Sequence, residues 1–597
     1  SRQQQRQQRP RQGQQTPARQ SSAQNTEDAP KKIKEVEYTT DTVRLRANTP
    51  KSIFHKLKTK DVEVTAVDRN GAPVEGQMVV VNENRVTFTP DSSAVGVKFV
   101  VKGKIQKDGD LGKKIIQYTA RALMGVRSIS LTYTSTDGTV LPGFMPVPKV
   151  IGLGKYNPDQ PLFEALPSSW APGLPFLLGW QDKEFAKDAA KKGWITSDSA
   201  LNSPYVMSKS EAYNFRANVE PFPDLRIDIN ANHTKSERTT EFYNPKDNEI
   251  DRFENRSVRG NFTMSINTMR TAFSKMGDEK GTPPSKAFEA LKANRATIAR
   301  RLANQVPTSG GYNPSIPDPN TGWPVGYGPT STQVLIPAFI AAYTGQSAEK
   351  VTLDPFPSIK YMRPNWRVTY EGVVAQSEFL KRYVKTLSFS HGYRSSYNVG
   401  SFISNLDYEF NEVDQFSWVR REIEGVQGDF IAENDINSVS ISEQFSPLIN
   451  MEITWLNDFE TRAELKTSRN VSLSFANNQI TEVLSNEMIF GLGYRFTKMD
   501  LIVKTKNSQK AYSNDLNIRG DLSFRKNKTI LRKIVEDNEQ LTAGQGSVTL
   551  KTTADYMLSD RFQLRVYFDK ILNNPYKGSF RTSNTNLGVS FRFTLAQ

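Results

Sequence analysis

Apolar and polar residues alternate with a period of two along much of the chain, and the last stretch shows the pattern most simply. From residue 587 the sequence runs Leu-Gly-Val-Ser-Phe-Arg-Phe-Thr-Leu. Successive side chains of a strand point to opposite faces, so one face of this stretch is entirely apolar. The alternation and the length are typical of a tilted transmembrane barrel strand, although a soluble sandwich strand alternates in the same way. The apolar stripe, expected to face lipid and to serve as a signal for barrel assembly, consists of Leu587, Val589, Phe591, Phe593 and Leu595.

The same alternation recurs from residue 127 to the C-terminus, where we expect about 14 to 16 strands. The clearest segments lie at 128–134, 213–219, 225–232, 258–268, 366–371, 387–391, 439–441, 451–455, 463–475, 488–496, 516–525, 548–556 and 562–569. Their second faces carry small polar residues and both signs of charge. A closed barrel around a water-filled lumen explains such faces and leaves no unpaired strand edge in lipid. The residues expected to face the lumen include Arg519, Asp521, Arg525, Arg565, Asp569 and Arg592.

The fold class predicted is therefore all-β: a transmembrane antiparallel β-barrel with a small soluble β domain near the N-terminus and helical insertions. Residues 1–32 are rich in Gln and Arg without apolar periodicity, which predicts a disordered linker. Residues 33–110 alternate in short runs around the turn signal Asn70-Gly71, which predicts a small periplasmic β-sandwich-like domain. Residues 111–126 change to helical spacing and predict an amphipathic helix before the barrel strands of 127–597.

Two long segments interrupt the strands. Residues 136–209 are rich in Pro, Gly and aromatic residues, and they predict a cap or a lumen plug, or alternatively a packed loop with its own small core. Residues 270–365 hold two helical patterns, at 285–303 and 334–343, and counting strands places this insertion on the periplasmic side. The aromatic residues singled out in the cap loop are Phe144, Trp170, Phe176 and Trp180.

Composition and motifs give little sign of enzyme chemistry. The net charge is +15, partly because of the Arg-rich N-terminal segment, and there is no Cys, which excludes disulfides and Cys-ligated metals. The three His residues are far apart in sequence and match no metal spacing. Gly491-Leu492-Gly493 lacks the third Gly of a phosphate-binding loop and lies within a strand pattern. We expect no enzymatic activity, no cofactor and no nucleic-acid partner. The chain has neither an apolar signal segment nor a long apolar run, so it is expected to be mature, processed or part of a longer polypeptide.

Several longer sequence words resemble one known family. They are SKAFEALKANR at 285–295, VLIPAFIAAYTG at 334–345, PNWRVTYEGV at 364–373, SFSHGYRSSYNVGSF at 388–402, SEQFSPLI at 442–449, TADYMLSDR at 553–561 and NTNLGVSFRFTLAQ at 584–597. LPGFMP at 141–146 and the 36–106 domain are also similar. Together these words resemble the C-terminal part of the SprA/Sov family, the outer-membrane translocon of the type 9 secretion system, from about residue 36 onward.

This resemblance implies a protein-conducting channel formed by a very large barrel, of which the chain is a C-terminal portion. It places the chain in the outer membrane of a Gram-negative bacterium, with periplasmic segments. The partners it implies are the lipid bilayer, the barrel-assembly machinery, cargo proteins with a C-terminal secretion signal, a partner outer-membrane barrel that captures cargo and a periplasmic plug protein. The alternatives are a porin or nutrient-transporter barrel, which leaks small solutes into liposomes, and a surface-attached structural β protein, which is extracted without detergent.

Overall fold

The computed structural model describes residues 33–106, 125–149, 151–155, 170–198, 200–246, 249, 251–274, 285–319, 321–423, 426–505, 508–559, 562–578 and 580–595. The chain divides into two compact units, residues 1–120 and 121–597. The predicted linker at 1–32 lies outside the described residues, and so does the predicted helix at 111–126 apart from its last two positions, where β8 begins at Val126.

The first unit contains two small antiparallel sheets that share one core. A four-stranded sheet pairs β7 with β1, β2 and β4, and a three-stranded sheet has the order β3-β6-β5. Val86, Phe88, Val97, Phe99 and Val101 fill the space between the sheets and are almost completely buried. The strands are β1 (Ile33–Thr39), β2 (Val43–Leu45), β3 (Lys51–Phe54), β4 (Val62–Val67), β5 (Gly76–Asn82), β6 (Arg85–Pro90) and β7 (Ala94–Gln106).

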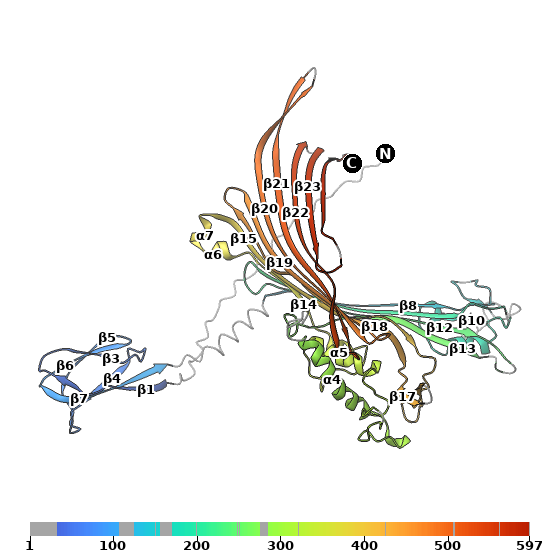
Figure 1. The fold of residues 1–597 in the computed structure, drawn as a ribbon, viewed down its shortest axis with the longest axis horizontal. Helices are drawn as coiled ribbons and strands as arrows, with labels where there is room; N and C mark the ends of the chain where they lie inside the picture. Colours follow the sequence, from blue (N-terminus) through green and yellow to red (C-terminus); the bar gives the residue numbers. More distant parts are fainter. Residues whose placement is uncertain are drawn as a thin grey trace, which may run out of the picture. The chain divides into compact units, whose positions relative to one another are not determined.

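The second unit is built on one large antiparallel sheet, which has 13 strands within the described residues (Figure 1). The order runs from β24 back to β18, then β15, β13, β12, β11 and β8, with β14 pairing between β12 and β15. The strands are β8 (Val126–Val140), β11 (Tyr205–Val219), β12 (Leu225–Tyr243), β13 (Phe253–Ser265), β14 (Asn365–Tyr370), β15 (Val384–Ser404), β18 (Asn434–Trp455), β19 (Phe459–Ser474), β20 (Gln479–Thr505), β21 (Ser508–Lys533), β22 (Asn538–Ser559), β23 (Phe562–Pro575) and β24 (Thr582–Phe593).

In the described residues, the strands of the large sheet are longer than the alternation predicts, and there are 13 of them instead of about 14 to 16. The patterns at 439–441 and 451–455 both belong to β18, whose pairing with β19 continues past a register shift between Phe445 and Ile449. The ladder of backbone hydrogen bonds is therefore interrupted around Pro447 and resumes beyond it, so one strand carries both patterns. The cap loop is also shorter than 136–209, because β8 extends to Val140 and β11 starts at Tyr205.

The insertion between β13 and β14 forms two helices that pack on one face of the sheet. Helix α4 (Lys286–Ala303) starts at Ser285, whose side chain accepts a hydrogen bond from the Phe288 backbone N–H. Helix α5 (Thr332–Thr344) is apolar on every side and buried, and it ends at Gly345, whose positive φ of 68° suits glycine. Short 3-10 turns η2 (Thr308–Gly310) and η3 (Ile359–Tyr361) complete the segment.

The core under these helices joins them to the ends of β13, β15, β18, β19 and β20. Phe288, Leu291 and Phe339 of the insertion are fully buried against strand residues such as Ile441 and Leu473. In Figure 1, α4 and α5 lie at the end of these strands that is opposite to the C-terminal end of β24. The register agrees, because the β19–β20 and β21–β22 turns lie at the insertion end, whereas β24 ends beside Phe562.

The cap segment between β8 and β11 forms a small core of its own in its described part. Trp194, Ile195 and the alanines of α3 (Phe185–Lys191) are buried there together with Tyr243 of β12. The other elements are β9 (Gly154–Lys155), β10 (Trp170–Ala171) and α2 (Leu174–Leu177). Elsewhere the second unit has the hairpin β16 (Arg420–Ile423) and β17 (Val426–Phe430), and the short helices α6 (Val373–Gln376) and α7 (Glu378–Lys381).

Candidate functional site: the two faces and the edges of the large sheet

The residues of one face of the sheet form a mainly apolar band that covers five positions on each of β20 to β23 and three on β24, where the next two positions are Thr585 and Ser583. One boundary row pairs Met488 with Phe524, then Val548, then Leu572. The other pairs Phe496 with Leu516, then Tyr556, Leu564 and Phe591. We call the face positions between these rows the apolar band. Its members are Met488, Phe490, Leu492, Tyr494 and Phe496 of β20; Leu516, Ile518, Gly520, Leu522 and Phe524 of β21; Val548, Leu550, Thr552, Ala554 and Tyr556 of β22; Leu564, Val566, Phe568, Lys570 and Leu572 of β23; and Leu587, Val589 and Phe591 of β24.

The width of this band suits a bilayer. Met488 to Phe496 is a run of nine residues, which spans about 30 Å along a strand. With the tilt usual in barrels, the height falls to roughly 25 Å, the height of the apolar band of outer-membrane barrels. Much of the band is exposed in the chain: Leu492 is 57% exposed and Phe591 is 64% exposed. A face this apolar and this exposed needs a covering of lipid or protein.

The predicted stripe of the last strand lies in or next to this band. Leu587, Val589 and Phe591 pair with Phe568, Val566 and Leu564 of β23. Phe593 continues the same face one row further, where its ring lies 6.5 Å from that of Phe562. Leu595 follows the end of β24 and is 80% exposed.

The opposite face of the same strands carries cross-strand ion pairs. Arg525 Nη2 lies 3.0 Å from Glu487 Oε2, and Arg565 Nε lies 2.5 Å from Asp555 Oδ1. Each pair joins neighbouring strands, so positive and negative groups alternate across the sheet. The register puts the remaining predicted lumen residues on this face too. Asp569 pairs with Lys551 and Asn586, and Arg592 pairs with Gln563.

Two glycines let other ion pairs reach across a whole strand. Arg462 of β19 and Asp521 of β21 both pair in register with Gly491 of β20, and their side chains meet above it at 3.0 Å. Glu460 and Arg519 approach above Gly493 in the same way, at 3.7 Å. A Cβ at Gly491 would lie 2.6 Å from Asp521 Oδ1. The Gly-x-Gly pattern therefore opens a shallow polar cavity of about 380 Å³ on the charged face.

The alternation of apolar and polar residues along the sequence does not reveal this role of glycine. The alternation predicts that Arg519 and Asp521 share a face, but not that their partners come from the strand after next. A glycine pair on the polar face of a central strand, flanked in register by opposite charges, is the signal that would have identified these pairs.

Both ends of the sheet are open among the described residues. β24 pairs with β23 only, and β8 pairs with β11 only. Residues 128–137 of β8 are almost all exposed, including Ile129 at 65% and Leu131 at 68%. The outer edges of β8 and β24 thus present backbone groups and apolar side chains that further strands can pair with and cover.

The aromatic residues predicted for the cap loop do not form one cluster. Phe144 packs beside the small core around Trp194 and bridges to Ile195, and Phe176 stacks on Phe185 at 4.9 Å. Trp170 lies in β10, paired with Lys155, whereas Trp180 is 76% exposed. The described part of the segment thus combines a packed core with one projecting indole.

A buried charge cluster, which the sequence analysis missed, connects the sheet to the insertion. Glu482 of β20 lies between Arg469 of β19, at 2.6 Å, and Arg532 of β21, at 2.9 Å, and Arg532 also pairs with Glu539. Arg469 donates to the backbone oxygen of Thr271 and lies over the Tyr343 ring. These charges occupy the same face as the apolar band, beyond its boundary, where α5 covers them.

Each of the three histidines contacts the surrounding protein: His55 is buried, and its Nδ1 accepts a hydrogen bond from the Leu57 N–H at 3.3 Å. His233 Nε2 lies 3.1 Å from the Pro357 oxygen and its ring contacts Phe262, and His391 Nδ1 lies 2.6 Å from the Leu448 oxygen. Nowhere in the described ranges do three or more acidic or histidine side chains gather so that they could hold a metal ion. Across those same ranges, no helix combines the length and the apolar character needed to cross a membrane.

No family model matches the chain, and no curated protein matches it.

Proposed function

We propose that the chain forms the C-terminal part of an outer-membrane, protein-conducting translocon of the type 9 secretion system. The apolar band carries this proposal: it is in register across five strands, it has the height of a bilayer core, and the face behind it is charged. The sequence words that resemble the SprA/Sov family supply the identity of the secretion system.

In this proposal the sheet is one section of the wall of a very large barrel. In the described residues the sheet has 13 strands and two open edges, and in this proposal further strands pair with β8 and β24 to complete the wall. The apolar band faces lipid, and its Lys570 lies one row from a boundary, where a long side chain reaches polar surroundings.

The charged face lines the lumen. Several of its charges are paired within the wall, as Arg462 is with Asp521 and Arg525 with Glu487, and both signs are present, so the lining offers neither an apolar surface nor a field of one sign to a passing protein. Cargo proteins with a C-terminal secretion signal pass along this face. The partner barrel, the plug protein and the barrel-assembly machinery belong to the proposal through the resemblance alone.

A pair of photo-crosslinking variants tests the proposed function in cells. The crosslinking amino acid p-benzoyl-phenylalanine replaces either Arg519, on the charged face, or its neighbour Ile518, on the apolar face. We expect secreted cargo to be captured from position 519 and not from position 518, because adjacent strand residues face opposite sides.

Capture of cargo from both positions, or from neither, would contradict the assignment of the faces. If no cargo is captured and the purified chain makes liposomes permeable to small sugars, the porin alternative replaces the translocon.

A further inference from the structure

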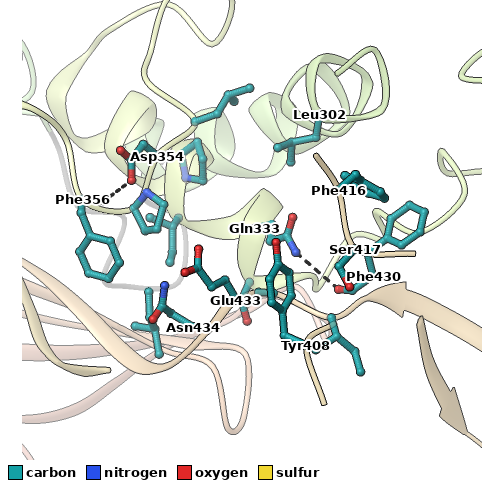
Figure 2. Close-up of a pocket in the computed structure, with 18 residues that line it drawn as sticks. Leu302, Gln333, Asp354, Phe356, Tyr408, Phe416, Ser417, Phe430, Glu433 and Asn434 are labelled. Carbon is teal, nitrogen blue, oxygen red and sulfur yellow. Dashed lines mark hydrogen bonds between the residues drawn. The ribbon is translucent and has the colours of Figure 1, made fainter. Parts of the chain in front are cut away.

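A pocket of about 280 Å³ lies between the helical insertion and the segments that connect β15 to β18. The first turns of α5, with Gln333 and Pro337, form one wall. Figure 2 shows Tyr408 and Glu433 pointing into the middle of the pocket, with Asp354 on one side and Phe416 on the other. The proposed translocon function assigns no role to this pocket.

The charge of the pocket opposes the charge of the chain. Asp354 and Glu433 contribute two carboxylates, and none of the described lining residues is Lys or Arg, although the chain has a net charge of +15. Loss of hydration beside the surrounding protein raises the pKa of Asp354, and this effect outweighs the opposite effects of Lys235 and of the Phe356 N–H, which donates to Asp354 Oδ1 at 2.8 Å. Two cations lie behind the lining rings: Lys235 is 5.2 Å from the centroid of the Phe356 ring, and Arg420 is 5.8 Å from that of Phe430.

Two lining residues, Ser417 and Gln333, carry further acceptors. The Ser417 side chain is only 2% exposed, and its hydroxyl has no hydrogen-bond partner among the described residues. Pro337 has no N–H, so it donates no helical hydrogen bond to the carbonyl of Gln333. The Gln333 side chain donates its Nε2 to the Phe430 oxygen at 3.5 Å, which leaves its Oε1 as an acceptor.

Aromatic rings enclose these acceptors. Phe356, Tyr408, Phe416 and Phe430 line the pocket, and Phe416 and Phe430 meet edge to face at 5.0 Å. Aromatic faces attract cations, and carboxylates pair with them, so this set of groups suits a positive ligand with several N–H donors and an apolar stem.

We infer that the pocket binds the guanidinium group of an arginine side chain presented by a polypeptide segment. A guanidinium group carries five N–H donors in a plane, stacks on aromatic rings and pairs with a carboxylate through two parallel hydrogen bonds. An arginine side chain also has the aliphatic stem that packs against Ile336 and Leu302 at the apolar wall.

Binding of capped amino acids to the detergent-solubilised full chain tests this inference directly. The probes are N-acetyl-arginine amide, its neutral isostere N-acetyl-citrulline amide, and a five-residue peptide with a central arginine. Calorimetry should show the arginine amide binding about tenfold more tightly than the citrulline amide, because the charge-assisted hydrogen bonds are lost in the isostere. The peptide should bind more tightly still.

Variants locate the site. The double change Asp354→Asn and Glu433→Gln should abolish the preference for arginine, whereas Glu349→Gln, at an exposed acid of the same insertion outside the pocket, should preserve it. Since the chain has no natural Cys, Ser417→Cys provides a second measurement: the arginine amide should slow labelling of the introduced thiol by N-ethylmaleimide, and the citrulline amide should not.

Equal binding of the two capped amino acids, or a preference that persists in the double variant, would overturn the site. A peptide that binds no better than the capped amino acid would overturn the polypeptide as its source. These measurements need no secretion, so a failure here is distinguishable from a failure of the proposed translocon function.

Discussion

Because position 491 of β20 is a glycine, charged side chains from the two neighbouring strands can form an ion pair above it. Arg462 and Asp521 belong to strands on either side of β20, a separation of about 10 Å, and their side chains meet in the space that a missing Cβ leaves. The glycine therefore has two roles: it allows this ion pair to form, and it adds no side chain of its own to the charged face.

Gly491→Ala should separate Arg462 from Asp521 and lower the free energy of unfolding by about 0.5 to 1 kcal/mol, because the new methyl group would lie 2.6 Å from Asp521 Oδ1 and displace this partly exposed ion pair. Gly520→Ala is the matched control on the apolar face, where the nearest atom, Thr552 Cγ2, is at an ordinary 3.5 Å. Denaturant unfolding of the refolded chain measures both, and an equal loss in the two variants would contradict the argument.

Glu482 is the shared counter-ion of two buried arginines. Glu482→Ala removes the carboxylate that pairs with both Arg469 and Arg532, and we expect a loss of about 3 to 5 kcal/mol, because an uncompensated buried charge is costly. Limited proteolysis should then cut the insertion, since the cluster fastens α5 to the sheet. Removal of an exposed partner, in Glu378→Ala, should change stability by no more than about 0.5 kcal/mol. If the insertion stays resistant to protease in the Glu482 variant, the charge cluster does not hold α5 on the sheet.

Among the elements, the loop between β15 and β16 depends on one carboxylate. Asp414 accepts hydrogen bonds from Ser309 Oγ at 2.7 Å and from Trp418 Nε1 at 2.8 Å, and these bonds lower its pKa below the usual 3.8. A lowered pKa means that the ionised carboxylate stabilises the folded state above pH 3.8 and that this stabilisation disappears as the pH falls through the folded-state pKa.

Hydrogen exchange in residues 405–418 should therefore be slower in the natural chain than in Asp414→Asn at pH 6, and the difference should shrink as the pH falls below about 4. Asn keeps an acceptor but loses the charge, so the comparison isolates ionisation. A difference that is independent of pH would contradict the assignment.

At the last strand, the two faces predict opposite tolerance of charge. Phe591→Arg places a charge in the apolar band and should reduce assembly into the membrane, with a cost of up to about 2 to 4 kcal/mol. Ser590→Arg, on the charged face beside Arg592, should assemble at nearly the natural level. The heat-modifiable fraction on unboiled gels measures assembly, and equal assembly of the two variants would refute the proposed faces.

Many of the strands and helices could be predicted from the sequence, because the alternation of side chains along a strand depends only on local backbone geometry. Helix α4 begins within a residue of the predicted start, and the stripe from Leu587 to Phe593 lies on one face of β24. Strand ends were less predictable, since the ladder of backbone hydrogen bonds resumes beyond Pro447 whatever the side chains are. The Arg469–Glu482–Arg532 cluster was not predictable, because it depends on which strands become neighbours and on α5 covering the apolar face.

At the scale of the whole molecule, one feature joins these observations. The same apolar face is exposed along the band from Met488 to Phe496 and is covered by the insertion beyond it, at Ile480 and Leu473. Strands of 22 to 27 residues, as in β20, β21 and β22, are much longer than the roughly 10 residues that a bilayer requires. In the proposed channel, one section of these long strands would contact lipid, while another section carries the folded insertion.

The most direct test of this account is the side of β24 that meets lipid. Because the chain has no Cys, Val589→Cys and Ser590→Cys can each carry a single environment-sensitive dye on opposite faces of adjacent residues. In reconstituted membranes we expect the dye at 589 to be quenched by nitroxide-labelled lipid and shielded from aqueous iodide, and the dye at 590 to show the reverse. Equal quenching of both dyes by iodide would contradict the membrane band and, with it, the proposed channel.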